Sequence, residues 1–158
     1  MNQIHSILLA EDNPLDTELT LAALSEHNLA NEVVVVTDGA EALDYLYNRG
    51  RFKLRANGNP AVVLLDLKMP KVDGLEVLRI VKSDENLKNI PVVMLTSSRE
   101  EQDLVRSYNL GVNSYVVKPV DFQAFMMAVK QIGVYWTVHN EPPVGSVRSP
   151  EHSDQKAP

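Results

Sequence analysis

Five short apolar runs, separated by longer segments of helical periodicity, are the feature that most constrains what this chain can fold into. The runs lie at residues 7–10, 33–36, 61–65, 92–95 and 115–117. They are rich in β-branched residues and apolar at successive positions, which is typical of strands in a parallel sheet covered on both faces. The intervening segments predict helices near residues 15–23, 40–47, 75–82, 100–108 and 122–136.

Strands and helices that alternate with short connections predict right-handed βαβ crossovers and a three-layer α/β domain. The chain has 158 residues, of which 44% are hydrophobic, and this fits one domain with a full core. From residue 138 onward prolines and charged residues become frequent. Residues 1–137 are therefore predicted to form the domain, and residues 138–158 a disordered tail.

Composition excludes several classes of function. The chain has no cysteine, which rules out disulfides, thiolate catalysis and cysteine-ligated metals. A net charge of -6 and a pI near 5.2 argue against nucleic-acid binding, which needs a basic surface. The first residues lack the features of a signal peptide, and no apolar run approaches the ~20 residues of a membrane span. We expect a cytoplasmic protein with neither nucleic acid nor membrane as a partner.

One connection, residues 48–60, is longer than the others and basic. It contains Arg49, Arg51, Lys53 and Arg55 among turn-forming residues. Such a cluster is consistent with a solvated loop, and the alternative is a docking contact for an acidic partner.

Polar side chains follow the apolar runs where each predicted strand ends. Glu11 and Asp12 follow the first run, Asp66 the third, Thr96 the fourth and Lys118 the fifth. Taken singly, each has a plain explanation as a turn, a cap, a strand end or a surface residue. Because ligands bind beyond the carboxyl ends of parallel strands, these groups are expected to meet at one edge of the sheet.

Three carboxylates at one edge would repel one another, and a divalent cation would remove that penalty. Magnesium fits, because it takes oxygen ligands and keeps several waters. Lys118 and the metal would offset the charge of an incoming phosphoryl group, and Asp66 could attack phosphorus as a nucleophile. Phosphoryl transfer requires little beyond positioning and charge stabilisation, so the combination predicts a phosphorylation site.

Four segments then resemble one family, the receiver domains of two-component response regulators. They are residues 8–13, residues 64–70 with 73–74, residues 95–98, and residues 115–119. The resemblance extends from about residue 4 to residue 132. It implies a flavodoxin-like, doubly wound parallel sheet of five strands in the order 2-1-3-4-5, with five helices.

The resemblance also implies roles at the site. Asp66 would be the phosphoacceptor, phosphorylated by a sensor histidine kinase. Asp12, Asp66 and the backbone carbonyl of Lys68 would hold Mg²⁺, with Glu11 acting mainly through a metal-bound water. Glu11 stands where aspartate is more frequent in the family; it keeps the charge, and its greater length could alter the outer ligands of the metal.

Further roles follow at the other two strand ends. Thr96, Ser97 and Lys118 would bind the phosphoryl group. Tyr115 would be an aromatic switch that turns inward as Thr96 moves toward that group. The peptide bond between Lys118 and Pro119 would be cis, which proline permits at modest cost.

A narrower resemblance connects the chain with stand-alone regulators associated with bacterial phytochromes. It rests on the long connection at residues 48–60 and on the ending from Val129 to Trp136. It implies that the partner histidine kinase is a bacterial phytochrome.

No effector domain is visible, so the signal is expected to leave through a surface of the receiver. The last predicted helix has a core stripe from Phe122 to Trp136 and a second apolar face. We expect a homodimer on the fourth helix, fifth strand and fifth helix, the alternative being a monomer with an apolar terminal helix. The residues predicted at the contact are Met127, Val134, Tyr135 and Trp136.

Three other functions are weighed against this one. A metal-dependent aspartyl-phosphate phosphatase usually has a second acid two residues after its nucleophile, where this chain has Lys68. A receiver-like interaction module that is not phosphorylated would have lost an acid or the lysine. A flavin or dinucleotide site needs a glycine-rich first turn. The sequence favours a single-domain response regulator that catalyses only its own phosphorylation and dephosphorylation, and otherwise is not an enzyme.

Overall fold

The computed structural model describes residues 6–26, 32–55 and 58–143. A five-stranded sheet runs through the centre in the order β2-β1-β3-β4-β5, and all neighbouring strands are parallel. The sequence prediction of a flavodoxin-like sheet in this order is confirmed. The strands are β1 Ser6–Ala10, β2 Glu32–Val36, β3 Val62–Leu65, β4 Val92–Thr96 and β5 Ser114–Val117.

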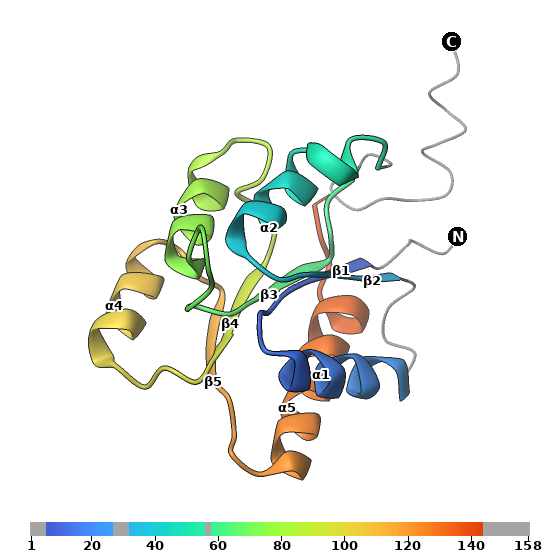
Figure 1. The fold of residues 1–158 in the computed structure, drawn as a ribbon, viewed down its shortest axis with the longest axis vertical. Helices are drawn as coiled ribbons and strands as arrows, with labels where there is room; N and C mark the ends of the chain where they lie inside the picture. Colours follow the sequence, from blue (N-terminus) through green and yellow to red (C-terminus); the bar gives the residue numbers. More distant parts are fainter. Residues whose placement is uncertain (1–5, 27–31, 56–57, 144–158) are drawn as a thin grey trace.

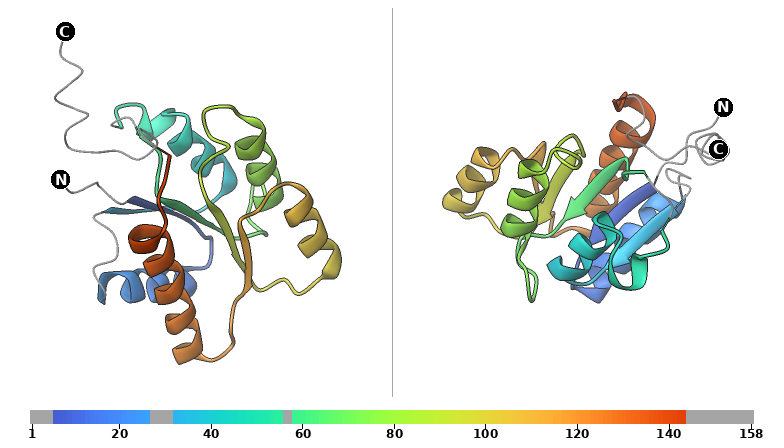
Figure 2. Two further views of the ribbon diagram at one scale, coloured as in Figure 1. Left: turned by 180° about the vertical axis from the view of Figure 1, so that it is seen from behind. Right: turned by 90° about the horizontal axis from the view of Figure 1, so that it is seen from above.

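Helices cover both faces of the sheet (Figure 1), with α1 and α5 on one face and α2, α3 and α4 on the other. The views in Figure 2 show the same three layers from behind and from above. The helices are α1 Pro14–Glu26, α2 Gly39–Leu46, α3 Gly74–Ser83, α4 Glu101–Asn109 and α5 Phe122–Val134. A short 3₁₀ turn, η1, spans Gly50–Phe52, and a π-helical turn, η2, spans Tyr135–His139.

Burial on both faces explains why the strands read as unbroken apolar runs. Ile7 and Leu9 of β1 pack with α1 and α5, whereas Leu8 and Ala10 pack with α2 and α3. All four are at most 2% exposed. A strand with a core on each side has no solvent-facing position for a polar residue, so its polar groups begin only where the strand ends.

Aspartate caps fix where three of the helices begin. Asp38, Asp73 and Asp121 are the N-caps of α2, α3 and α5, and each accepts a hydrogen bond from the backbone N–H three residues later. Gly74 begins α3 directly against the end of β3. A Cβ atom there would lie 2.2 Å from the carbonyl oxygen of Asp66, so only glycine lets this helix approach the strand end.

The arginines of the long basic connection are engaged within the molecule. Arg49 lies 3.5 Å from the Asp44 carboxylate, and Arg51 lies 3.1 Å from Glu41. Arg55 donates to the carbonyl of Tyr45 at 3.0 Å and stacks over its ring. These contacts hold the described part of the connection on α2, which favours the solvated loop over a docking site.

The carboxyl-terminal segment continues the last helix. The η2 turn follows α5 without a break, and Thr137 donates its hydroxyl to the carbonyl of Gly133 at 2.6 Å. Beyond it, residues 140–143 lie beside the amino ends of the strands, where Pro142 and Pro143 share a small pocket with Pro60 and Pro91. Residues 144–158, which make up most of the predicted tail, lie outside the described residues.

Candidate phosphorylation site

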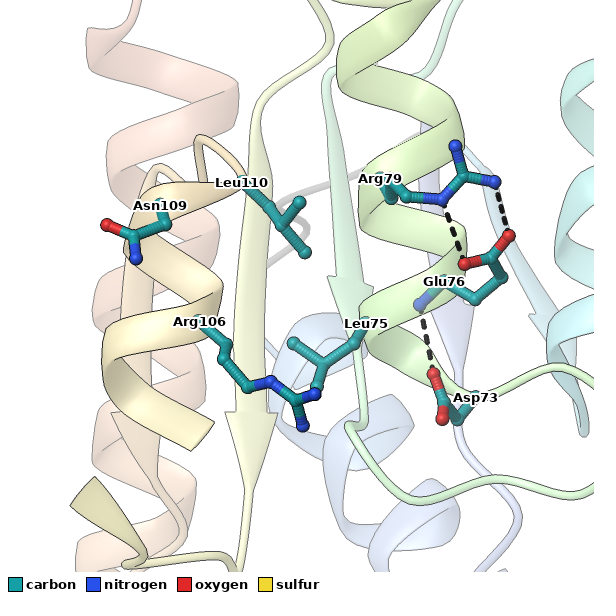
Figure 3. A pocket seen from close by; sticks show the side chains of 7 residues that line it. All are labelled: Asp73, Leu75, Glu76, Arg79, Arg106, Asn109 and Leu110. Carbon is teal, nitrogen blue, oxygen red and sulfur yellow. Dashed lines mark hydrogen bonds and ion pairs between the residues drawn. The ribbon is translucent and has the colours of Figure 1, made fainter. Parts of the chain in front are cut away.

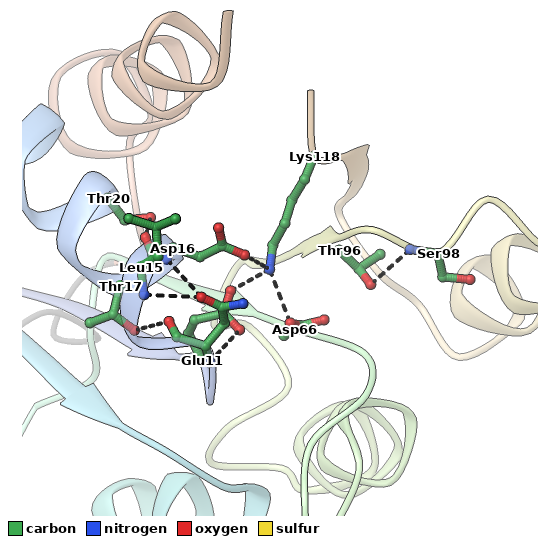
Figure 4. Close-up of polar contacts among 10 residues, drawn as sticks. Glu11, Leu15, Asp16, Thr17, Thr20, Asp66, Thr96, Ser98 and Lys118 are labelled. Atoms are coloured by element: carbon green, nitrogen blue, oxygen red, sulfur yellow. Dashed lines mark hydrogen bonds and ion pairs between the residues drawn. The ribbon is translucent and has the colours of Figure 1, made fainter. Parts of the chain in front are cut away.

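The strand register brings the predicted polar groups together. Ala10 pairs with Leu65, and Thr96 pairs with Val117, so the residues that follow β1, β3 and β5 leave the sheet at one edge. Backbone bonds continue the alignment past the strands: Asp66 N–H donates to Ala10, and Lys118 N–H donates to Thr96. Figure 4 shows the Glu11, Asp66, Thr96 and Lys118 side chains gathered there.

The acids form a cluster that could hold a divalent cation. Glu11, Asp12 and Asp66 each offer a carboxylate oxygen within 4.8 Å of the others. Glu11 is 3% exposed and Asp66 8% exposed, while Asp12 faces solvent. Three carboxylates this close need a compensating charge, and an all-oxygen donor set of this kind suits Mg²⁺ or a similar ion. The residues present therefore fit the predicted metal.

Lys118 donates all three of its ammonium protons to carboxylates. Its Nζ binds Glu11, lies 2.8 Å from an oxygen of Asp16 and lies 3.1 Å from Oδ2 of Asp66. The side chain is 8% exposed, so water screens these contacts only weakly. The ammonium therefore lies directly against the predicted phosphoacceptor, at the point where a phosphoryl group on Asp66 would add negative charge.

Burial and the contacts with Lys118 shift the pKa values of Glu11 and Asp66 in opposite directions. Burial raises the pKa of Glu11 to about 8, and the neighbouring Asp66 adds to the rise. Burial also opposes ionisation of Asp66, but the hydrogen bonds from Glu11 and Lys118 outweigh it and lower the pKa of Asp66. Burial disfavours the charged form of Lys118, yet its bonds to Asp16 and Glu11 raise its pKa. The acid with the lowered pKa is the predicted phosphoacceptor.

Thr96 and Tyr115 meet through the backbone of Ser98. The Ser98 N–H donates to the Thr96 hydroxyl at 3.2 Å, and the Tyr115 hydroxyl donates to the Ser98 carbonyl at 3.1 Å. Thr96 is 1% exposed and helps to lower the pKa of Asp66, whereas Ser97 faces solvent. Tyr115 is half-buried against the core. Ser98 thus links the two predicted switch residues, and their roles stay predictions, as do those of Ser97 and of the Lys68 carbonyl.

The predicted cis bond before Pro119 is wrong. Every peptide bond among the described residues is trans. Trans is the intrinsically favoured isomer of an X–Pro bond, and here it already lets the Lys118 side chain reach three acids.

Sequence reasoning missed Asp16. Asn13 caps α1 by accepting bonds from the N–H groups of Leu15 and Asp16, which places Asp16 in the first helical turn. From there its carboxylate reaches Lys118 at 2.8 Å. The available signal was its spacing: Asp16 lies four residues after Asp12, which is one turn of a helix that begins at the strand end.

The predicted dimer residues divide into two groups. Met127 and Tyr135 are 53% and 52% exposed, whereas Val134 and Trp136 pack against the core beneath α1 and α5. Phe122, predicted as part of the core stripe, is 57% exposed, because it is the first residue of α5 and lies beyond the sheet edge. An apolar face exists on this helix, but it is smaller than the sequence suggested.

A groove of about 420 Å³ between α3 and α4 contains none of the predicted site residues (Figure 3). Leu75 and Leu110 contribute its apolar part. Of its two arginines, Arg79 is bound to Glu76 at 2.9 Å. The remaining lining residues are Asp73, Arg106 and Asn109, so two acids balance the two arginines. The groove therefore takes no part in the site and has no net charge to select a ligand.

Residues 7–130 match the family model of the response regulator receiver domain, and the chain therefore belongs to this family. Response regulator Rcp1 of Synechocystis sp. is 37% identical over 130 residues, which cover 82% of this chain and 87% of Rcp1. The crystal structure of its Mn²⁺-bound form has a TM-score of 0.82 at 35% identity, over 89% of this chain and 99% of that one.

Two other solved structures are similar. The bacteriophytochrome response regulator AtBRR is 64% identical with a TM-score of 0.71, covering 89% of this chain and 100% of that one. The phosphorylated cyanobacterial phytochrome response regulator RcpA is 41% identical with a TM-score of 0.83, covering 88% of this chain and 98% of that one. The chain is thus similar to response regulators linked with phytochromes. Among the described residues, the helices are too short or too polar to cross a membrane.

Proposed function

We propose that the chain is a phosphorelay response regulator that accepts a phosphoryl group on Asp66 from a phosphohistidine of a sensor kinase. The observation that carries the proposal is the contact of the Lys118 ammonium with an ionised, buried Asp66 beside two further acids. An Asp66 oxygen attacks phosphorus, the P–N bond breaks, and the imidazole keeps the electron pair. The output is a change in protein–protein contacts, and the relay operates in the cytoplasm.

The residues around Asp66 supply the positioning and charge that this transfer needs. Lys118 lies against Asp66, where the negative charge would be added, and the Thr96 hydroxyl would donate to a phosphoryl oxygen. Asp12, Asp66 and the Lys68 carbonyl would hold Mg²⁺, with Glu11 acting through a water. When bound, the ion neutralises charge on the acids and on the phosphoryl oxygens.

Incubation with acetyl phosphate and Mg²⁺, followed by intact-protein mass spectrometry, tests the proposal. The wild type should gain the mass of one phosphoryl group, and Asp66→Asn should gain none. A chelator should abolish the gain. Equal labelling of Asp66→Asn would refute Asp66 as the acceptor, and steady turnover of a phosphate monoester would favour the phosphatase instead.

The donor we propose is the histidine kinase of a bacterial phytochrome. The support is similarity to the bacteriophytochrome response regulator AtBRR and to the cyanobacterial phytochrome response regulator RcpA. Phosphotransfer from a phosphorylated bacteriophytochrome kinase should be much faster than from an unrelated histidine kinase at equal concentration. Equal rates from the two kinases would remove the phytochrome assignment and leave the phosphoacceptor intact.

We also propose a homodimer on the face formed by α4, β5 and α5, with η2 at the end of that face. Met127 and Tyr135 remain exposed there, together with Val138 at 63% exposure. Tyr135 and Trp136 stack edge to face, with centroids 4.8 Å apart, so the exposed ring is anchored to a half-buried one. Sedimentation should show a dimer that Tyr135→Asp dissociates. A wild type that stays monomeric at high concentration rules the dimer out.

A further inference from the structure

Ser98, two residues after β4, makes four hydrogen bonds at the junction between the site and α4. Its hydroxyl donates to Oδ2 of Asp103 at 2.7 Å and accepts from the N–H of Glu100 at 3.4 Å. Its N–H donates to the Thr96 hydroxyl, and its carbonyl accepts from the Tyr115 hydroxyl. One residue therefore connects the phosphoryl-binding threonine, the half-buried tyrosine and the first turn of a helix.

The bond to Asp103 completes an unusual helix cap. The N-cap of α4 is Glu100, whose own side chain makes no capping bond. In a capping box, the acid three residues after the N-cap bonds the N-cap N–H directly. Here Asp103 occupies that position, and the Ser98 hydroxyl stands between the two groups. Asp103 and Ser98 are 7% and 8% exposed, and the helix dipole favours the carboxylate in the first turn.

The same serine orients the Thr96 hydroxyl. A hydroxyl has one proton to donate and two acceptor positions. The Ser98 N–H occupies one acceptor position of Thr96 and leaves the hydroxyl proton free to be donated on the side of Asp66, whose pKa Thr96 helps to lower. A displacement of Ser98 would therefore break its hydrogen bond with the Thr96 hydroxyl and its hydrogen bond with the Tyr115 hydroxyl at the same time.

We propose that Asp103 is a positioning residue for phosphoryl transfer: through Ser98 it holds Thr96 and Tyr115 in the arrangement that serves Asp66. The inference rests on the proposed function, since it assumes that Asp66 is the acceptor. Asp103 is a buried acid of α4 and would not touch the phosphoryl group. It would nevertheless affect the rate at which Asp66 accepts that group.

The first measurement is the initial rate of Asp66 phosphorylation by acetyl phosphate at saturating Mg²⁺, with the full chain. Asp103→Ala and Ser98→Ala should each lower the maximal rate about three- to ten-fold, the effect of one lost buried hydrogen bond. The double variant should be no slower than either single variant. Asp103→Asn, which keeps an acceptor oxygen, should stay within about two-fold of the wild type.

Glu101→Ala is the matched control, because it removes an exposed acid from the same helical turn. Its rate should equal that of the wild type. An equal loss in Glu101→Ala and Asp103→Ala would overturn the proposal, because the effect would then be one of helix charge. Losses that add in the double variant, or Asp103→Asn as slow as Asp103→Ala, would also overturn it.

The second measurement is hydrogen exchange of the Ser98 and Glu100 amides, made also in an Asp66→Asn background. Both amides should exchange faster in Asp103→Ala than in Glu101→Ala. Faster exchange with an unchanged phosphorylation rate would show a cap without a positioning role and would overturn the proposal. A wild type that accepts no phosphoryl group would end both proposals, whereas a failure confined to the Asp103 variants ends only this one.

Discussion

Two lysines, one at each edge of the sheet, each donate all three ammonium protons. Lys118, at the carboxyl edge, donates to Glu11, Asp16 and Asp66. Lys82, at the amino edge, donates to the carbonyls of Lys88 and Ile90 at 3.1 and 2.9 Å, and to the Asn113 side chain at 3.0 Å. The two groups match in the number of bonds and differ in the charge of the acceptors.

That difference suits Lys82 to a structural role and Lys118 to the proposed role in phosphoryl transfer. Neutral acceptors leave the Lys82 charge uncompensated, and burial lowers its pKa. Carboxylate acceptors raise the pKa of Lys118 despite burial, because they favour the charged form. Lys82 ties the end of α3 to the segments that enter β4 and β5. Lys118 instead holds together acids that would repel one another, and in the proposed reaction it would exchange one of them for a phosphoryl oxygen.

The largest expected effect comes from Lys118→Met, which keeps the side-chain length and removes the charge. We expect the rate of Asp66 phosphorylation to fall about 100-fold or more, because only the metal ion then offsets the charge of the incoming group. Mass spectrometry after incubation with acetyl phosphate measures the rate. Lys118→Arg should not restore it, since a planar guanidinium does not reproduce a compact ammonium. A rate near that of the wild type would show that the Lys118 charge is not needed for phosphorylation, and the proposed difference between the two lysines would be wrong.

Lys82→Met should show the opposite profile. Three acceptors lose their donor, so the free energy of unfolding should fall by about 1–3 kcal/mol. The phosphorylation rate should stay the same, because the substitution is at the other edge of the sheet. Urea denaturation followed by circular dichroism gives the free energy of unfolding. A slower phosphorylation reaction in Lys82→Met would show that the two edges are coupled and that the division of roles is wrong.

Much of this site could be predicted because the strands specify it. A strand that is buried on both faces is apolar at every position, and polar residues follow directly after its last residue. Asp66 and Lys118 can therefore be recognised in the sequence as the polar residues at which two apolar runs stop. Parallel pairing then brings those ends to one edge without further information. The acid cluster follows from this logic, whereas the strand order was implied by the resemblance to receiver domains, and the structure places both as expected.

The other features of the structure depend on helix rotation and loop conformation, which the periodicity of apolar residues does not specify. Asp16 reaches Lys118 because the Asn13 cap sets the rotation of α1, and the sequence does not fix that rotation. Phe122 was expected in the core, but its position at the first turn of α5 leaves it exposed. The trans bond before Pro119 and the relay through Ser98 depend on loop conformations that no apolar pattern encodes.

The pH dependence of stability should distinguish the two edges further. With a chelator present, the free energy of unfolding should fall as the pH rises from about 5 to 8. The pKa of Glu11 is raised from 4.5 to about 8 in the folded protein, so in this window the folded state binds more protons than the unfolded state. Glu11→Gln should flatten the profile, and so should Mg²⁺, which favours the ionised carboxylate. If the free energy of unfolding depends on pH equally in Glu11→Gln and in the wild type, the group that titrates is not Glu11.

The smallest expected effect concerns Asp16, the acid that completes the contacts of Lys118. Asp16→Asn keeps an oxygen within reach of the ammonium and removes one negative charge near the incoming phosphoryl group. We expect phosphorylation to become about two- to five-fold faster at low salt, since one source of repulsion is gone. Asp16 is 25% exposed, so the gain should shrink as salt screens it.

Glu18→Gln is the matched control for Asp16→Asn, because Glu18 is an exposed acid on the same helix. It removes the same charge at a position with no contact to Lys118 among the described residues. A gain in Asp16→Asn alone would assign the effect to the lysine's own partners. A slower reaction in Asp16→Asn would mean that Lys118 needs all three carboxylates to stay beside Asp66, and the acceptor charges would then matter for position more than for repulsion.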